Sequence, residues 1–126
     1  MIYSLIFFAL AGISNAVMDT LQHHFWQSIF NTDRFNHKWW DPEESWSNKY
    51  KNNKEADGPK FPGSTTVFVF VTDAWHLFQF LMITFCAIAV VIPMNYHWLI
   101  KIAGVLLLKL AWSGLFIPAY KKWFIR

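Results

Sequence analysis

Three long apolar runs divide the chain. They cover about residues 2–30, 64–92 and 96–120, and polar residues gather in the stretch 31–63 between the first two runs. An α-helix of about 20 apolar residues crosses the roughly 30 Å hydrocarbon core of a bilayer. The pattern therefore predicts an all-α integral membrane protein with three transmembrane helices in a single membrane domain, residues 1–126.

The second run contains the most unusual polar interruption. No charged residue occurs from Leu77 to Ile92, yet Asp73 and His76 stand just before this stretch and after the apolar residues Val67–Val71. If one helix covers 64–92, both ionisable groups lie inside a membrane span. Such groups are costly in a bilayer unless they face a partner or a water-filled cavity, so a functional role is expected for them.

The connection 31–63 is the one sizeable polar region, with six acidic and six basic residues. Within it, Asp41-Pro42-Glu43 has the form of a helix start, with Asp as the cap and Pro at the first helical position. We expect a short amphipathic helix from there to about Lys51. It would lie on the membrane surface, with aromatic side chains in the headgroup layer: Trp39, Trp40, Trp46 and Tyr50.

Composition supports a membrane protein. The chain is 55% hydrophobic and 15% charged, against about 25% charged in soluble domains. The net charge of +3 equals the charge of Lys121, Lys122 and Arg126, which favours a topology signal over a nucleic-acid surface, so no nucleic-acid partner is expected. The single cysteine, Cys86, excludes an intramolecular disulfide.

The distribution of basic residues predicts an orientation. Positive charge favours the cytoplasmic side, which assigns both the basic C-terminal end and the Lys-containing connection to the cytoplasm. Three spans then place the N-terminus outside, with the first span uncleaved. The expected location is the cell (inner) membrane.

Polar residues of different spans match in depth under this topology. Asp19 lies eleven residues before Phe30, at the inner end of the first span, which corresponds to about 16 Å along a helix. Asp73 lies ten residues after Gly63, at the inner end of the second span, which corresponds to about 15 Å. His23 and His76 follow the two acids by four and three residues, so each helix presents an acid and an imidazole on one face. Lys109 of the third run is expected in the same layer.

Asp and His at this spacing on facing helices can coordinate zinc, iron or manganese. The predicted metal ligands are Asp19, His23, Asp73 and His76, and the predicted catalytic residues are Asp19, Asp73 and Lys109. A bound metal would activate water for hydrolysis of a lipid or lipid-linked substrate at the cytoplasmic side of the bilayer. These short patterns lack a family signature, and the chain has neither a glycine-rich phosphate loop nor a GxSxG elbow.

Two other interpretations remain open. The same charges could hold helices together through contacts worth about 1 kcal/mol each, as in a viral or bacterial structural or assembly subunit of holin-like size. They could also line a proton or ion path, which would require oligomers because three helices scarcely enclose one. The expected partners are membrane lipid and either further copies of the chain or another membrane protein.

Overall fold

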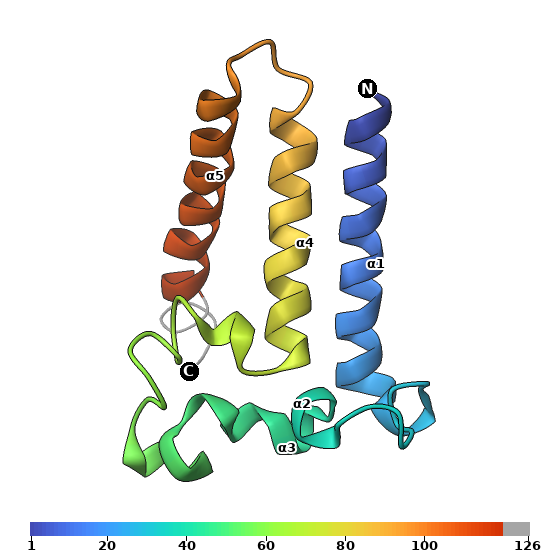
Figure 1. The fold of residues 1–126 in the computed structure, drawn as a ribbon, viewed down its shortest axis with the longest axis vertical. Helices are drawn as coiled ribbons and strands as arrows, with labels where there is room; N and C mark the ends of the chain where they lie inside the picture. Colours follow the sequence, from blue (N-terminus) through green and yellow to red (C-terminus); the bar gives the residue numbers. More distant parts are fainter. Residues whose placement is uncertain (120–126) are drawn as a thin grey trace. The chain divides into compact units, whose positions relative to one another are not determined.

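The computed structural model describes residues 1–119, which form helices of very different lengths (Figure 1). The long ones are α1 (Ile2–His24), α4 (Ala74–Val91) and α5 (Trp98–Pro118). No strand occurs in this part of the chain, where Tyr50 and Pro59 form an isolated antiparallel bridge. The predicted all-helical fold is confirmed.

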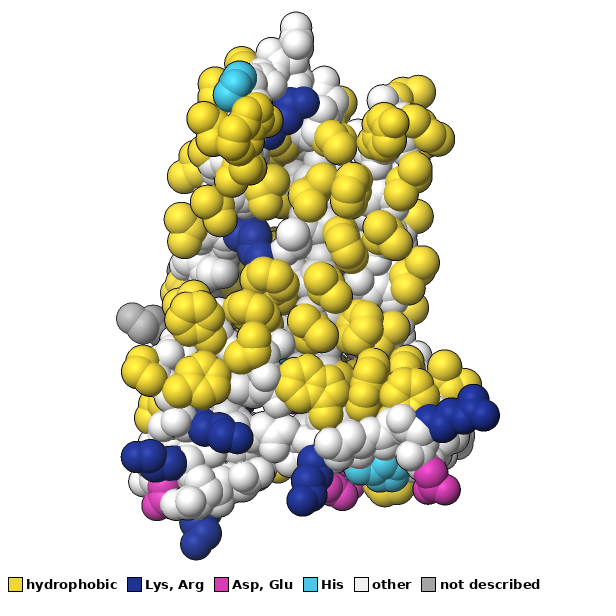
Figure 2. Space-filling model, viewed as in Figure 1, with side chains coloured by type: hydrophobic (Ala, Val, Ile, Leu, Met, Phe, Trp, Pro, Cys, Tyr) yellow, Lys and Arg dark blue, Asp and Glu magenta, His cyan; other side chains and the backbone are white. Residues whose placement is uncertain are grey.

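Three helical segments are long and apolar enough to cross a membrane: Ile2–Gln27, Ala74–Val91 and Trp98–Phe116. They coincide in order with the three predicted spans. Hydrophobic side chains cover the visible face of the long helices, and most charged side chains in the same view belong to the connection (Figure 2). Lys121, Lys122 and Arg126, on which the predicted orientation depends, lie outside the described residues.

The second span is shorter than predicted. Residues 64–73 form turns and the 3₁₀ helix η5 (Val69–Val71), and α4 begins only at Ala74. Gly63, just before this stretch, has a positive φ of +83°. The Ser64 hydroxyl donates a hydrogen bond of 2.7 Å to the carbonyl of Lys49, which ties the stretch to the connection. β-branched residues are frequent between 65 and 72 and favour the helix weakly. The predicted continuous helix over 64–92 is therefore wrong.

The connection folds into a series of short helices. They are η1 (Phe25–Gln27), α2 (His37–Trp40), α3 (Pro42–Ser45), η2 (Trp46–Lys49), η3 (Lys51–Asn53) and η4 (Glu55–Asp57). The predicted helix start is confirmed, because Asp41 accepts the Glu43 N–H at 2.9 Å and Pro42 opens α3. The helical stretch ends at Lys49, close to the predicted Lys51.

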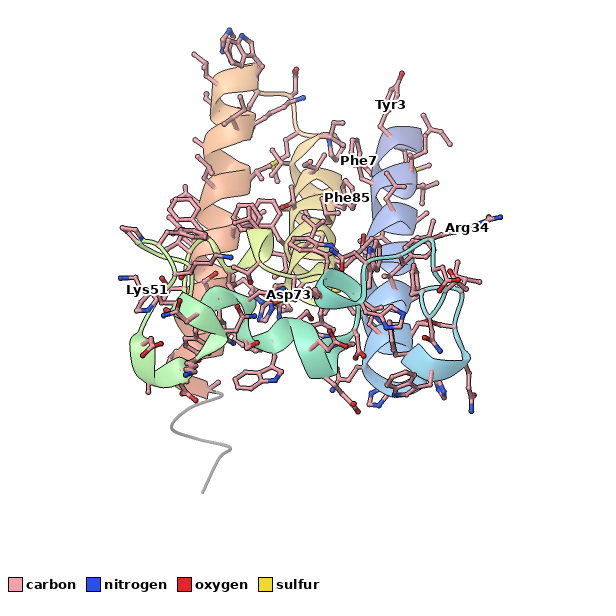
Figure 3. All side chains as sticks on the ribbon, turned by 60° about the horizontal axis from the view of Figure 1, so that its bottom comes forward. Tyr3, Phe7, Arg34, Lys51, Asp73 and Phe85 are labelled. Atoms are coloured by element: carbon pink, nitrogen blue, oxygen red, sulfur yellow. The ribbon has the colours of Figure 1, made fainter. Side chains whose placement is uncertain are left out.

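The contacts between residues divide the chain into two compact units. Among the described residues, one unit contains 1–11 and 83–119, and the other contains Gly12–Met82. In the first unit Phe7 and Phe85 face each other with ring centroids 6.1 Å apart (Figure 3), and Val91 packs against Gly104. The lack of a side chain at Gly104 leaves room for the Val91 side chain of α4.

The second unit has a small apolar core. Leu21, Phe25 and Ala74 are buried in it, and partly buried side chains surround them: Val17, Phe30, Trp39, Trp40 and Trp75. Trp40 stacks on Phe30 with centroids 4.8 Å apart and planes within 7°. Trp39 and Trp40 thus pack partly on the protein core, and their contact with the headgroup layer stays a prediction. Trp46, in contrast, is 50% exposed.

Candidate functional site

The second unit brings Asp73 and His76 into direct contact at the start of α4. Asp73 Oδ1 accepts the backbone N–H of His76 at 2.9 Å, which makes Asp73 the N-cap of the helix. Its other oxygen, Oδ2, lies 2.7 Å from His76 Nδ1. Asp73, which was predicted within a span, therefore stands at the end of its helix. Because residues 64–73 do not form an α-helix, the predicted distance of about 15 Å along a helix from Gly63 to Asp73 does not apply.

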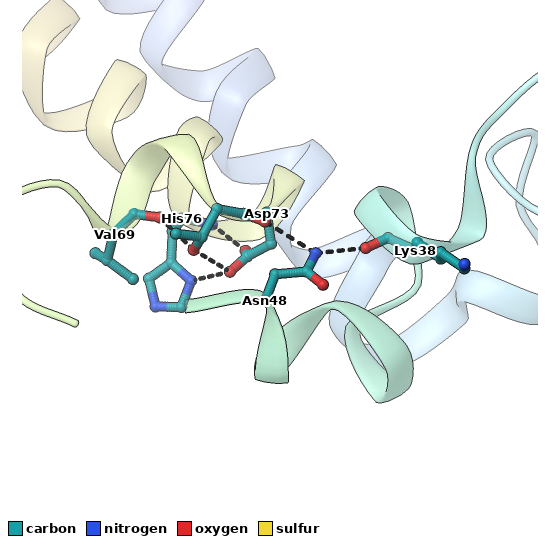
Figure 4. A network of polar contacts seen from close by, with 6 residues as sticks. Lys38, Asn48, Val69, Asp73 and His76 are labelled. Carbon is teal, nitrogen blue, oxygen red and sulfur yellow. Dashed lines mark hydrogen bonds and ion pairs between the residues drawn. The ribbon is translucent and has the colours of Figure 1, made fainter. Parts of the chain in front are cut away.

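Neighbouring polar groups fix the position of the carboxylate (Figure 4). The Thr72 hydroxyl lies 2.6 Å from the carbonyl oxygen of Val69 and 3.2 Å from Asp73 Oδ2. Asn48 donates to the carbonyl of Thr72 at 3.0 Å and to that of Lys38, so the connection is tied to the turn before α4. The carboxylate consequently has little freedom to rotate.

This geometry determines which imidazole nitrogen is available. The Asp73 side chain is 3% exposed and the His76 side chain 24% exposed. A carboxylate that accepts a hydrogen bond from Nδ1–H leaves the lone pair of the neutral imidazole on Nε2. The Trp75 ring meets the imidazole edge-on at 5.1 Å and limits its motion. In that tautomer, Nε2 is the nitrogen of His76 that can accept a proton.

A pocket of about 210 Å³ lies beside this pair. Its walls come from α1, α3, η2 and the first turn of α4, and its lining residues are Gln22, Pro42, Ser45, Trp46, Asp73, Trp75 and His76. No pattern along the chain identifies Ser45 and Trp46 as pocket residues, because they are about 30 residues from His76 and only the folding of the connection brings them there. The pocket combines two indoles with a few polar groups.

The structure places the other predicted site residues elsewhere. Asp19 and His23 are exposed on α1, and Asp19 accepts a hydrogen bond from Asn15 at 3.3 Å. Lys109 belongs to the other unit, where it donates to the Thr84 hydroxyl at 2.7 Å. Of the four predicted metal ligands, the structure thus brings together Asp73 and His76.

A different set of ligand-type side chains comes together in the connection. His37, Asp41 and Glu44 each offer an atom within 4.8 Å of the others, and no other group of three His, Cys, Asp or Glu in residues 1–119 meets this condition. Asp19, His23, Asp73 and His76 therefore do not form such a group. Metal coordination by those four residues stays a prediction.

Comparisons with known proteins add no assignment. No protein-family model, curated protein or solved structure matches the chain. The functional argument rests on the geometry of the site.

Proposed function

We propose that the protein is a small integral membrane enzyme in which His76, oriented by Asp73, acts as a general acid–base on a lipid or lipid-linked substrate. The observation that carries the proposal is the 2.7 Å contact between Asp73 Oδ2 and His76 Nδ1 at the edge of a pocket. The reaction class is hydrolysis or transfer at an ester or phosphate group.

Membrane insertion is supported by exposed apolar surface. In the most apolar 18-residue stretch of α5, no residue is buried within the described structure. In the equivalent stretches of the first and second spans, only 17% of the residues are buried. Leu107 and Leu110 are 66% and 67% exposed. Contiguous apolar surface of this extent is rare in water-soluble proteins and normal in contact with lipid tails.

The chemistry is supported by the division of roles between the two residues. A buried carboxylate that binds Nδ1–H keeps the imidazole in one tautomer and stabilises the imidazolium formed when Nε2 takes a proton. A positioned histidine of this kind contributes about 10²–10⁴ to a rate. His76 can therefore activate water or a hydroxyl group of the substrate and return the proton to the leaving group.

The substrate class is inferred from the pocket's position and walls. His76 lies in the first turn of α4, and the end of a span lies near the headgroup layer, where lipid esters and phosphates are found. Trp46, Trp75 and Pro42 offer apolar contact, and Gln22 and Ser45 offer hydrogen bonds. An amphiphile fits this mixture better than a wholly polar metabolite. The proposed location of the pocket on the cytoplasmic side follows from the distribution of basic residues alone.

The test uses the full chain reconstituted into vesicles of mixed phospholipids, with products identified by mass spectrometry. We expect the wild type to release a lipid product and His76→Gln to lose about 10²-fold or more of that rate. His24→Gln is the matched control, because His24 is an exposed histidine of α1 that does not line the pocket. Full activity of His76→Gln, or no product from the wild type with any lipid class, would refute the proposal.

One observation favours a second candidate, a non-enzymatic membrane subunit. Asp73 caps α4 through Oδ1, and this structural role explains a buried aspartate without any reaction. In that case the unburied apolar faces would contact further copies or another membrane protein. Wild-type vesicles would then give no product, and Asp73 variants would change stability or oligomeric state alone.

A further inference from the structure

Three metal-ligand side chains converge within eight residues of the connection. His37 lies in α2, Asp41 between α2 and α3, and Glu44 in α3. Their ligand atoms all lie within 4.8 Å of one another. This group is separate from Asp73 and His76 and has no part in the acid–base role proposed above.

The local backbone explains why the three side chains meet. The Asn36 side chain accepts the Lys38 N–H at 3.1 Å and starts α2, and the Asp41 N–H donates to the His37 carbonyl at 2.9 Å. The Ser45 N–H then donates to the Asp41 carbonyl at 2.8 Å. Asp41 itself has an extended backbone (φ −78°, ψ 114°) and joins α2 to α3, and this arrangement brings its carboxylate close to His37 and Glu44. The chain geometry is set before any ligand binds.

In the described part of the chain, the carboxylates of Asp41 and Glu44 form no ion pair. Asp41 is 2% exposed, and its Oδ1 accepts the Glu43 N–H, whereas Oδ2 accepts none of the hydrogen bonds found in the described chain. Within residues 1–119, no Lys, Arg or His nitrogen lies within 4.0 Å of the carboxylates of Asp41 or Glu44. A buried carboxylate is unfavourable unless it is paired with a cation or bound to a metal. A cation bound between the three side chains would pair with these carboxylates.

The imidazole of His37 is held at the edge of this group by apolar contacts. Its ring meets Phe25 at 5.4 Å and Trp26 at 6.5 Å, both close to perpendicular. It lies more than 4.0 Å from either carboxylate, which is too far for a hydrogen bond but close enough for a shared ion after small side-chain rotations. Protein ligands bind such ions at about 2.0–2.2 Å.

We infer that His37, Asp41 and Glu44 bind one divalent transition-metal ion of the Mn²⁺ or Zn²⁺ type. One imidazole nitrogen and two carboxylate oxygens suit these ions, with water completing the coordination. The ion links α2 to α3 and stabilises the segment that supplies Pro42 and Ser45 to the pocket.

The experiment titrates Mn²⁺ into the purified full chain in detergent and follows the loss of the free-ion signal by electron paramagnetic resonance. We expect one bound ion per chain, displaced by Zn²⁺. Asp41→Asn and Glu44→Gln should each weaken binding by at least about tenfold. The asparagine retains the helix cap of α3, so circular dichroism should be unchanged in this variant.

Glu43→Gln is the matched control, since Glu43 is an exposed acid next to the group but outside it. It should bind Mn²⁺ as the wild type does. Absence of stoichiometric Mn²⁺ and Zn²⁺ binding would overturn the inference, and so would equal weakening by Glu43→Gln and Glu44→Gln, which indicates diffuse attraction. Because the readout is metal binding, its failure leaves the His76 proposal intact, and the reverse also holds.

Discussion

Asp73 is expected to combine two separable roles, and a pair of substitutions distinguishes them. Asp73→Asn retains an oxygen that can accept the His76 N–H, so the cap of α4 survives. Its amide, however, presents N–H groups to His76 Nδ1, which forces the ring into the other tautomer and removes the lone pair from Nε2. Asp73→Ala removes both the cap and the imidazole contact.

The magnitudes follow from the observed contacts. Loss of an N-cap costs about 0.5–2 kcal/mol, and the 2.9 Å bond to the His76 N–H has good geometry for such a cap. Loss of a hydrogen bond to a charged group costs about 1.5–3 kcal/mol, and the value here belongs near the lower end because the His76 side chain is 24% exposed. We therefore expect Asp73→Ala to lower the free energy of unfolding by about 2–4 kcal/mol.

Asp73→Asn should lower the free energy of unfolding by about 1 kcal/mol, since only the charge-assisted part of the bond to the His76 imidazole is lost. In the lipid-turnover assay the rate of product release by Asp73→Asn should nevertheless fall by about 10²-fold or more, as we also expect for Asp73→Ala. Unfolding by SDS in mixed micelles, followed by far-ultraviolet circular dichroism, measures the stabilities. Asp19→Ala is the control, expected within about 0.5 kcal/mol of wild type because Asp19 is exposed. Equal destabilisation by alanine and asparagine would refute the capping role.

Three further predictions concern the connection and the spans. Asn48→Ala removes the bonds to the carbonyls of residues 38 and 72, and should lower the free energy of unfolding by about 1–3 kcal/mol in the same SDS titration. Gly63→Ala should cost about 1–3 kcal/mol, because φ is +83° and a Cβ would lie 2.8 Å from the Phe68 ring. In sealed vesicles, native Cys86 of α4 should resist a membrane-impermeant maleimide and react after SDS is added.

Each of these predictions has a matched control. Asn95→Ala changes an exposed asparagine and should shift stability by less than about 0.5 kcal/mol. Gly12→Ala should be neutral or stabilising by up to about 1 kcal/mol, since Gly12 lies in α1 with open space at its Cβ. Lys54→Cys in a Cys86→Ala background should react with the maleimide when its side of the membrane is accessible. Rapid labelling of Cys86 in intact vesicles would contradict membrane insertion.

The helix start in the connection shows how local chemistry can be predicted. Asp41 and Pro42 form their cap because an acceptor oxygen and a fixed φ act within one turn, without help from the rest of the fold. The convergence of His37, Asp41 and Glu44 could not be predicted in the same way, because the extended backbone of Asp41 interrupts the helical spacing between α2 and α3.

The start of α4 shows where prediction from local pattern failed. Residues 64–73 are apolar enough to extend the span, but the Ser64 hydroxyl binds the Lys49 carbonyl and Asn48 binds the Thr72 carbonyl. These contacts join residues 15 and 24 positions apart. Hydropathy carries no information on partners so distant, and the helix consequently begins ten residues later than expected.

The sequence by itself determined the three apolar helices, their order and the pairing of Asp73 with His76, because hydrophobic length and a three-residue spacing act locally. Only the tertiary structure decided that Asp73 is a cap, that Ser45 and Trp46 reach His76, and that Trp40 packs on Phe30. Those outcomes depend on how a 33-residue polar connection closes on itself. Its closure is governed by side-chain to backbone hydrogen bonds between distant residues, which no periodicity along the chain encodes.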